Sequence, residues 1–202
     1  MAPPKTPVPL RPSTAAWPEI LTERLGALAP SALHLIGPAD LLTSRKVALF
    51  CSTRTPGSAI LHAHDSARRL RDEGATVISG FHSPIEKECL KILLRGKQPI
   101  IICPGRAIES MRIPADCRAA FKAGRILFLS PFTKQPKRVT KESALRRNEV
   151  VAALAHEAYV AHIESGGKTD QIVRRLNEWK VPFLSSARSR PGLLRDALPG
   201  TR

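Results

Sequence analysis

The chain has 202 residues, with 32 lysines and arginines against 17 aspartates and glutamates, which gives a formal net charge of +15. This length suits one domain, and an apolar fraction of 43% supports a real core, which argues against a wholly disordered basic chain. Only 4% of the residues are aromatic, which disfavours a protein that binds single strands by stacking many bases on aromatic rings. The positive charge favours a phosphate-bearing partner, and the competing explanation is a proteome that is basic throughout.

The two ends of the chain differ in composition from its middle. The sequence predicts a disordered proline-rich arm over residues 1–16, one α/β domain over 17–186 and a flexible basic tail over 187–202. No apolar run approaches the ~20 residues that cross a bilayer, and the start of the chain has no hydrophobic signal segment. We therefore expect a cytoplasmic protein without a membrane partner. The four cysteines form no CxxC pair and suggest no disulfide framework.

Short apolar runs alternate with helical patterns along the middle of the chain. Strands are predicted over residues 46–51, 76–79, 99–103, 125–129, 158–163 and 181–184. Helices are predicted over residues 58–73, 84–95, 114–123, 141–156 and 168–179. This alternation is typical of a parallel sheet covered on both faces. With right-handed crossovers it predicts a Rossmann-like, doubly wound α/β fold with a mostly parallel sheet and helices on both faces.

Ligands of such folds bind beyond the carboxyl ends of the strands, which makes five loops candidate sites. The first, residues 52–57, contains small residues that allow close backbone approach, and Arg54 offers a planar phosphate donor. An ordinary turn with a solvated arginine explains it equally well. The glycine pattern GxGxxG is absent, so NAD or FAD binding is not supported.

The next two loops offer weaker candidates. Gly80 permits close backbone approach, and His82 and Glu86 suggest an acid–base pair, although a turn followed by exposed charges is the better explanation. Gly105 and Arg106 follow the strand at residues 99–103, where they are available to an anion. Lys97 precedes that strand, which places it at the strand's start.

The fourth loop is the most basic part of the chain. Between residues 134 and 147 it carries six cations against one acid, Glu142, which favours phosphate contacts over a merely solvated loop. In the fifth loop, residues 166–169 read Gly-Gly-Lys-Thr, like half of a P-loop, but a full motif needs glycine where this chain has His162. What remains is a glycine-rich turn at a helix N-terminus, which suits a phosphate.

Metal and nucleophile sites have little support. His62 and His64 lie two apart in a predicted helix, so their side chains point apart. Cys51 and Cys103 fall at strand ends and are interpreted as core thiols. We predict no metal, no cofactor and no catalytic residue, and lean towards a protein that is not an enzyme.

Four motifs together resemble the DNA-processing protein A family over residues 17–184. KVALFCSTR is similar to the family's V-A-I-V-G-S-R, and TVISGFHSPIEKECL to S-G-x-A-x-G-I-D-x-x-A-H. GKQPIIICPG resembles G-K-T-I-A-V-x-G-x-G, and LRRNEVVAALAHEAYVAHIESGGKT resembles R-R-N-R-I-I-A-x-L-S followed by S-G-S-x-x-T. The chain departs from the second motif at four positions. The family's arginine, glycine, aspartate and histidine are replaced by Ser83, Pro84, Glu86 and Cys89, in that order.

The resemblance implies binding of single-stranded DNA in a basic pocket, a homodimer, and loading of a recombinase in transformation or recombination. Arg54, Lys97 and residues 146–148 are the positions that it carries over. Together with the loops, it gives a predicted phosphate-binding set: Ser52, Thr53, Arg54, Ser79, Gly80, Lys97, Gly105, Arg106, Lys137, Arg138, Arg146, Arg147, Asn148, Ser165, Gly166, Gly167, Lys168 and Thr169.

Two alternatives use the same pocket. One is a sensor that binds a phosphorylated nucleotide without turnover. The other is an enzyme like the "lonely guy" nucleoside-monophosphate phosphoribohydrolases, which share this kind of fold and use a P-G-G-x-G-T-x-x-E motif. Residues 164–169 echo it in part, but Ile172 stands where the motif has its glutamate. The DNA-binding hypothesis is therefore preferred.

Overall fold

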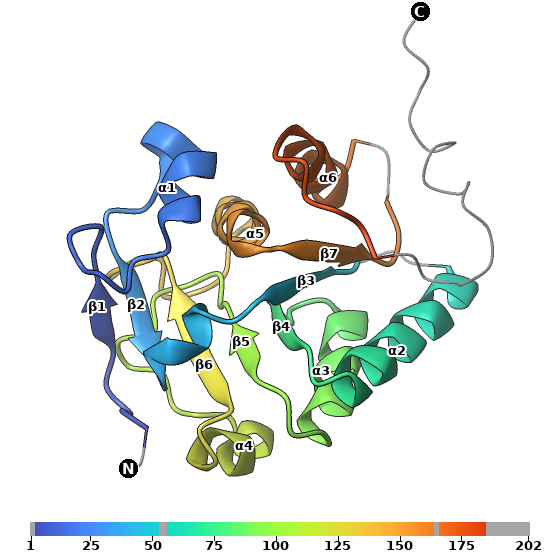
Figure 1. The fold of residues 1–202 in the computed structure, drawn as a ribbon, viewed down its shortest axis with the longest axis horizontal. Coiled ribbons are helices and arrows are strands. Elements are labelled where there is room, and N and C mark those ends of the chain that lie inside the picture. Colours follow the sequence, from blue (N-terminus) through green and yellow to red (C-terminus); the bar gives the residue numbers. More distant parts are fainter. Residues whose placement is uncertain (1–2, 53–55, 164–165, 185–202) are drawn as a thin grey trace, which may run out of the picture.

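The computed structural model describes residues 3–52, 56–163 and 166–184, which form one sheet with helices on both faces (Figure 1). The strands are β1 Val8–Leu10, β2 Leu33–Ile36, β3 Lys46–Phe50, β4 Thr76–Ser79, β5 Ile100–Ile102, β6 Ile126–Ser130 and β7 Glu157–Val160. The helices are α1 Glu19–Leu25, α2 Gly57–Asp72, α3 Pro84–Leu94, α4 Arg118–Lys122, α5 Lys141–Leu154 and α6 Lys168–Glu178. Short 3₁₀ turns occupy Gly26–Leu28, Ala39–Leu42 and Ala115–Cys117.

The strand order is β1-β2-β6-β5-β4-β3-β7. The run from β6 to β7 is parallel throughout, and β1 and β2 extend it as antiparallel strands. The chain moves from β3 through β4 and β5 to β6, and α5 then carries it back to β7 on the other side of β3. The topological switch point therefore lies between β3 and β7, as in other doubly wound sheets. The prediction of a Rossmann-like, mostly parallel α/β fold is confirmed.

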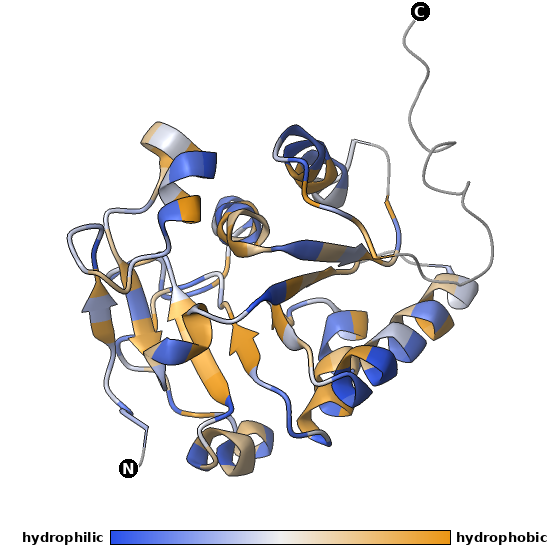
Figure 2. Ribbon diagram, in the orientation of Figure 1, coloured by the Kyte–Doolittle hydropathy of each residue, from blue (hydrophilic) through white to orange (hydrophobic). Residues whose placement is uncertain are grey.

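The parallel strands are buried on both faces, which explains their uninterrupted apolar sequences. Ala48, Ile78 and Ile101 lie side by side in register and contribute to the core beneath α1, α5 and α6. Their neighbours along the strands, such as Leu49 and Ile100, point into the second core, beneath α2, α3 and α4. Figure 2 shows the strands β5 and β6 as almost wholly hydrophobic.

The start of the chain differs from the prediction of a disordered arm over residues 1–16. Val8–Leu10 pairs antiparallel with β2, and the side chain of Leu10 is buried. Pro9 is compatible with this strand because β1 is the edge of the sheet, where a residue without an N–H group leaves no neighbour unpaired. The folded unit therefore begins before residue 17. The predicted tail over residues 187–202 lies outside the described residues.

Most predicted elements are present with shifted ends. The predicted strand over residues 181–184 is reduced to one parallel bridge, between Phe183 and Ala158. The predicted helix over residues 114–123 is divided into a 3₁₀ turn and the short α4. No helix among the described residues combines the length and apolar character needed to cross a bilayer.

Lys46 gives the fold a pH dependence that can be measured. Its side chain is 3% exposed, its ammonium donates to the carbonyls of Leu42 and Ser44 at 2.7 Å, and burial lowers its pKa to about 8 from the ordinary 10.5. Between these two values the unfolded chain binds more protons than the folded one, so raising the pH favours folding.

We therefore expect the free energy of unfolding of the wild type to rise relative to that of Lys46→Met as the pH goes from 8 to 10. Urea unfolding of both proteins across this range checks the prediction. A constant difference between the two proteins would contradict it.

Candidate functional site

The carboxyl ends of β3 and β7 meet at the switch point, where Ser52 joins two of the candidate loops. Its hydroxyl donates to the carbonyl of His162 at 2.9 Å and lies 3.0 Å from the hydroxyl of Thr169. Ser52 is buried, so this hydroxyl connects protein segments. The structure thus brings Ser52 and Thr169, two members of the predicted set, into contact with each other. Thr53, Arg54 and Ser165 lie outside the described residues.

In the glycine-rich turn before α6, a backbone N–H group is bonded to a carboxylate of the protein itself. Gly166 has a φ of +72°, and its N–H group donates to the carboxylate of Asp170 at 3.1 Å. This bond, with a contact from Arg174, lowers the pKa of Asp170. Gly167 is the N-cap of α6, and Lys168 is the helix's first residue. The N–H group of Gly166 therefore serves a protein carboxylate rather than standing ready for a phosphate.

A second internal carboxylate, Glu86, connects the end of β3 to the start of α3. Its side chain is 7% exposed and accepts from the backbone N–H groups of Cys51, His82 and Ser83 at 3.1, 2.8 and 3.2 Å. Ser83 in turn caps the helix by accepting from the N–H group of Glu86 at 3.2 Å. Glu86 thus meets the backbone of His82 and is buried, whereas the sequence predicted an exposed charge.

Gly80 and Arg147 form the closest contact at this edge. Arg147 comes from α5, is 3% exposed and donates from Nη1 to the carbonyl of Cys103 at 2.9 Å. A Cβ atom at residue 80 would lie 1.4 Å from the same nitrogen. The close approach that Gly80 permits is therefore to a protein guanidinium, and Arg147 lies beneath the surface instead of on it.

Ser79 and the neighbouring thiols also belong to the interior. The Ser79 hydroxyl donates to the carbonyl of Leu49 at 2.7 Å and is fully buried. Burial raises the pKa of Cys103 to about 12, and a hydrogen bond with Cys89 together with burial raises that of Cys51. The interpretation of Cys51 and Cys103 as core thiols is confirmed. The described residues contain no group of side chains suited to a metal ion.

The residues of the Arg-Arg-Asn motif point in different directions, because successive helix residues are separated by about 100° of rotation. Arg146 lies on the α1 side, where its guanidinium bonds to the carbonyl of Leu28 and pairs with Glu149. Asn148 is half-buried on α5. The motif therefore supports packing of α5 at least as much as it supports a surface.

At the carboxyl edge of the sheet, a group of exposed positive charges lies on the loop between β6 and α5. Lys134, Lys137, Arg138 and Lys141 are all exposed and make no ion pair within the described part of the chain. The loop is anchored by a bond from the Ala107 N–H group to the Pro136 carbonyl at 2.9 Å. Gly105 packs below Val139, and the Arg106 carbonyl accepts from Ser130 at 2.7 Å. We call residues 134–141 the basic loop.

A pocket of about 400 Å³ opens beside the basic loop, between the starts of two helices. Pro84 and its neighbours begin α3, and Lys141 begins α5, so two helix N-termini on opposite faces of the sheet meet here. Thr140 caps α5 by accepting from the Ser143 N–H group at 3.1 Å. The described residues that line it include no acidic side chain. They are His82, Ser83, Pro84, Val139, Thr140, Lys141 and Ala144.

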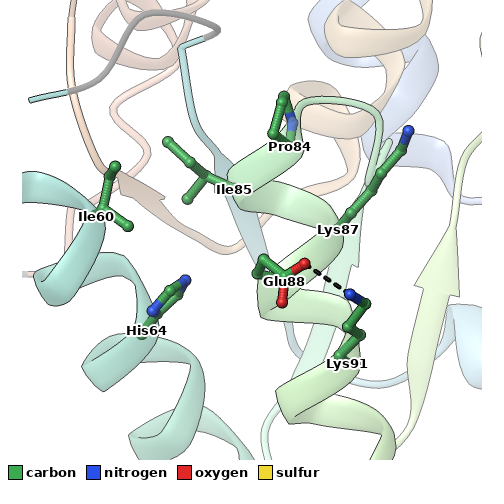
Figure 3. Close-up of a pocket in the computed structure, with 7 residues that line it drawn as sticks. All are labelled: Ile60, His64, Pro84, Ile85, Lys87, Glu88 and Lys91. Atoms are coloured by element: carbon green, nitrogen blue, oxygen red, sulfur yellow. Dashed lines mark hydrogen bonds and ion pairs between the residues drawn. The ribbon is translucent and has the colours of Figure 1, made fainter. Parts of the chain in front are cut away.

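A second pocket, of about 450 Å³, lies on the other side of Pro84, between α2 and α3 (Figure 3). Ile60 and His64 reach into it from α2, and Ile85 lies opposite on α3. Its cations are partly compensated, because Glu88 pairs with Lys91 at 2.7 Å. This pocket is therefore less suited to an anion than the one beside the basic loop.

Lys97 does not join these residues. It is exposed in the turn before β5, at the amino end of that strand and hence at the opposite edge of the sheet. Of the predicted set, Lys137 and Arg138 remain as exposed surface charges at the carboxyl edge, and Arg106 is half-buried there. His82, Thr140 and Lys141 were missing from that set. The predicted helix over residues 141–156 already placed a helix start here, and the Thr140–Ser143 capping pattern was the signal that would have drawn attention to its N-terminus.

The contact between Gly80 and Arg147 predicts a specific stability pattern. Gly80→Ala should lower the free energy of unfolding by roughly 2 kcal/mol or more, because the added methyl group overlaps a buried guanidinium. In an Arg147→Ala background the same change should cost much less, since the overlapping atoms are gone.

Urea unfolding of the four proteins in this cycle measures the coupling. Gly57→Ala is the matched control: no atom lies within 4 Å of the added methyl group, so its effect should stay within ~1 kcal/mol. Equal costs of Gly80→Ala in both backgrounds would disprove the contact.

Comparison with known proteins identifies the fold. The structure resembles DNA processing protein A from Streptococcus pneumoniae with a TM-score of 0.71, at 20% identity over 87% of this chain and 61% of that one. It resembles the Helicobacter pylori protein with a TM-score of 0.68, at 21% identity over 88% of this chain and 79% of that one. The chain thus spans about three fifths of the length of the Streptococcus protein. No curated protein matches the sequence. The family model for DNA recombination-mediator protein A matches residues 10–169, which is most of the chain, and the protein therefore belongs to that family.

Proposed function

We propose that this protein binds single-stranded DNA through phosphate contacts on the basic loop and acts in DNA processing or recombination. The observation that carries the proposal is the group of exposed, unpaired cations at residues 134, 137, 138 and 141, beside a pocket without acidic lining residues. Membership of the recombination-mediator family gives nucleic acid as the expected source of phosphate. The Helicobacter relative has a described single-stranded DNA binding mode.

The side chains of the basic loop are suited to sequence-independent binding of single-stranded DNA. Lysine ammonium groups act as point charges and contact phosphate without reading base edges. The starts of α3 and α5 add partial positive charge at the same pocket. Two buried or half-buried carboxylates at this edge, Glu86 and Asp170, are already bonded to backbone N–H groups. Their charges are partly compensated, so a phosphate above them meets less repulsion.

The enzyme alternative has less support. Ile172, at the position of the expected glutamate, is 1% exposed and belongs to the core beneath α6. No carboxylate among the described residues lines the pocket beside the basic loop. A nucleotide sensor would use the same cations. Affinity that grows with the length of the strand indicates a DNA-binding protein, and affinity that does not grow indicates a nucleotide sensor.

The family resemblance also supports two partner proposals: that the protein is a homodimer and that it helps to load a recombinase onto DNA. Light scattering of the purified protein tests the first, and a pull-down with a purified bacterial recombinase, with and without oligo-dT, tests the second.

The binding proposal predicts a change in salt dependence. Fluorescence anisotropy with labelled dT20 should show affinity that falls steeply with salt. The variant Lys137→Ala/Arg138→Ala/Lys141→Ala should bind more weakly, and its slope of log K against log salt should be shallower by about 2, at ~0.7 for each phosphate contact on a single strand.

The control variant loses the same charge elsewhere. Arg68→Ala/Arg95→Ala/Arg175→Ala removes two exposed cations, on α2 and at the end of α3, and one half-buried cation on α6. Its slope should stay close to that of the wild type. Identical behaviour of the two triple variants would reject the basic loop as the site, and absence of dT20 binding at low salt would reject the function.

A further inference from the structure

A third pocket lies at the amino edge of the sheet, away from the carboxyl ends of the parallel strands. It measures about 370 Å³ and is formed by the start of the chain, the segment after β5 and the short helix α4. Figure 1 shows α4 at the lower margin of the molecule, where the chain enters β6, with the N-terminal segment beside it. The described lining consists of Lys5, Met111, Arg112, Ile113, Arg118, Phe121 and Lys122.

The floor of this pocket is apolar and packs on the core. Phe121 is 3% exposed, and its ring lies 6.2 Å from that of Phe128 in a tilted arrangement within the core. Met111 and Ile113 are half-buried and pack against the same core. The floor therefore exists before any ligand arrives, which lowers the cost of binding.

The rim carries only positive charge. Lys5, Arg112, Arg118 and Lys122 are exposed, and none of them forms an ion pair with another described residue. Arg118 is held beside the pocket by a weak bond from Nε to the Ile113 carbonyl at 3.5 Å. Four like charges around one hollow repel one another, and an anion placed between them relieves that repulsion.

We propose that this amino-edge pocket is a second nucleotide site, which holds a base against the apolar floor and its phosphates between the rim cations. The volume falls within the range of small-molecule pockets, about 300–1,000 Å³. Arginine supplies both a flat surface for a base and a two-pronged phosphate donor. The described lining of the pocket contains no acidic residue that would repel a phosphate.

The proposal rests on the proposed function for the source of the nucleotide, a single strand of DNA, and a free nucleotide is the other source of the same chemistry. Because the pocket and the basic loop lie at opposite edges of the sheet, one molecule would hold two separate stretches of nucleic acid. The protein would then bind long single strands with two classes of contact.

The test combines two triple variants and two probes on the full chain. The amino-edge variant is Arg112→Ala/Arg118→Ala/Lys122→Ala, and the basic-loop variant is the one described above. Both are measured with dT20 and with dTTP, and the Arg68→Ala/Arg95→Ala/Arg175→Ala protein is the charge-matched control. Circular dichroism confirms that each variant is folded, and no floor residue is changed.

We expect residual dT20 binding in the basic-loop variant, and a further loss of roughly tenfold or more when the amino-edge changes are added. Photo-cross-linking of a dT20 that carries 4-thiothymidine should label Met111 or Phe121 in the wild type and not in the amino-edge variant.

Each other outcome decides between the two proposals. If the amino-edge changes alter binding of neither probe beyond the control, the second site is rejected while the basic loop stands. If wild-type protein ignores dT20 but binds dTTP in a way that only the amino-edge changes abolish, the DNA-binding function fails and the pocket is a free-nucleotide site. Binding of polyglutamate at this pocket in preference to both probes would overturn the nucleotide assignment in favour of an acidic peptide.

Discussion

The buried guanidinium of Arg147 determines how the carboxyl edge of the sheet is built. It reaches from α5 beneath the ends of β4 and β5, bonds to the Cys103 carbonyl and requires a glycine at residue 80. A cation is costly to remove from water, and the Cys103 carbonyl offsets part of that cost by accepting from Nη1. This contact fixes α5 against the sheet, and the basic loop leads directly into α5. The position of the exposed charges therefore depends on a buried charge.

Two carboxylates of the protein also hold the loops at the carboxyl edge in place. Glu86 satisfies three backbone N–H groups between β3 and α3, and Asp170 satisfies Gly166 before α6. In many doubly wound proteins such N–H groups receive a phosphate. At the turns that the structure describes, the carboxylates of Glu86 and Asp170 accept from these N–H groups instead. The groups at this edge that can still bind an anion are therefore the long side chains of the basic loop. This arrangement is consistent with a ligand such as a DNA strand, which lies across a surface rather than entering a closed phosphate cradle.

Much of the fold was readable from the sequence because each parallel strand is an uninterrupted apolar run and each long helix has apolar residues at helical spacing. The antiparallel strands β1 and β2 were not predicted: β1 contains a proline, and only pairing with β2 makes it a strand. The site was harder, because sequence places residues on loops without showing which way they point. Arg147 was assigned to the surface and is buried, whereas Lys97 was grouped with residues that lie at the other end of the parallel strands. The charge of +15 indicated a phosphate-bearing partner, but only the structure distinguished unpaired surface cations from those that hold the protein together.

Lysine footprinting tests the central claim most directly. The protein is acetylated briefly with and without dT20, and the modification of each lysine is quantified by mass spectrometry. If DNA lies on the basic loop, Lys137 and Lys141 lose reactivity in the complex, while Lys180, which is exposed after α6, keeps it. Unchanged reactivity at Lys137 and Lys141 in a saturated complex would contradict the account.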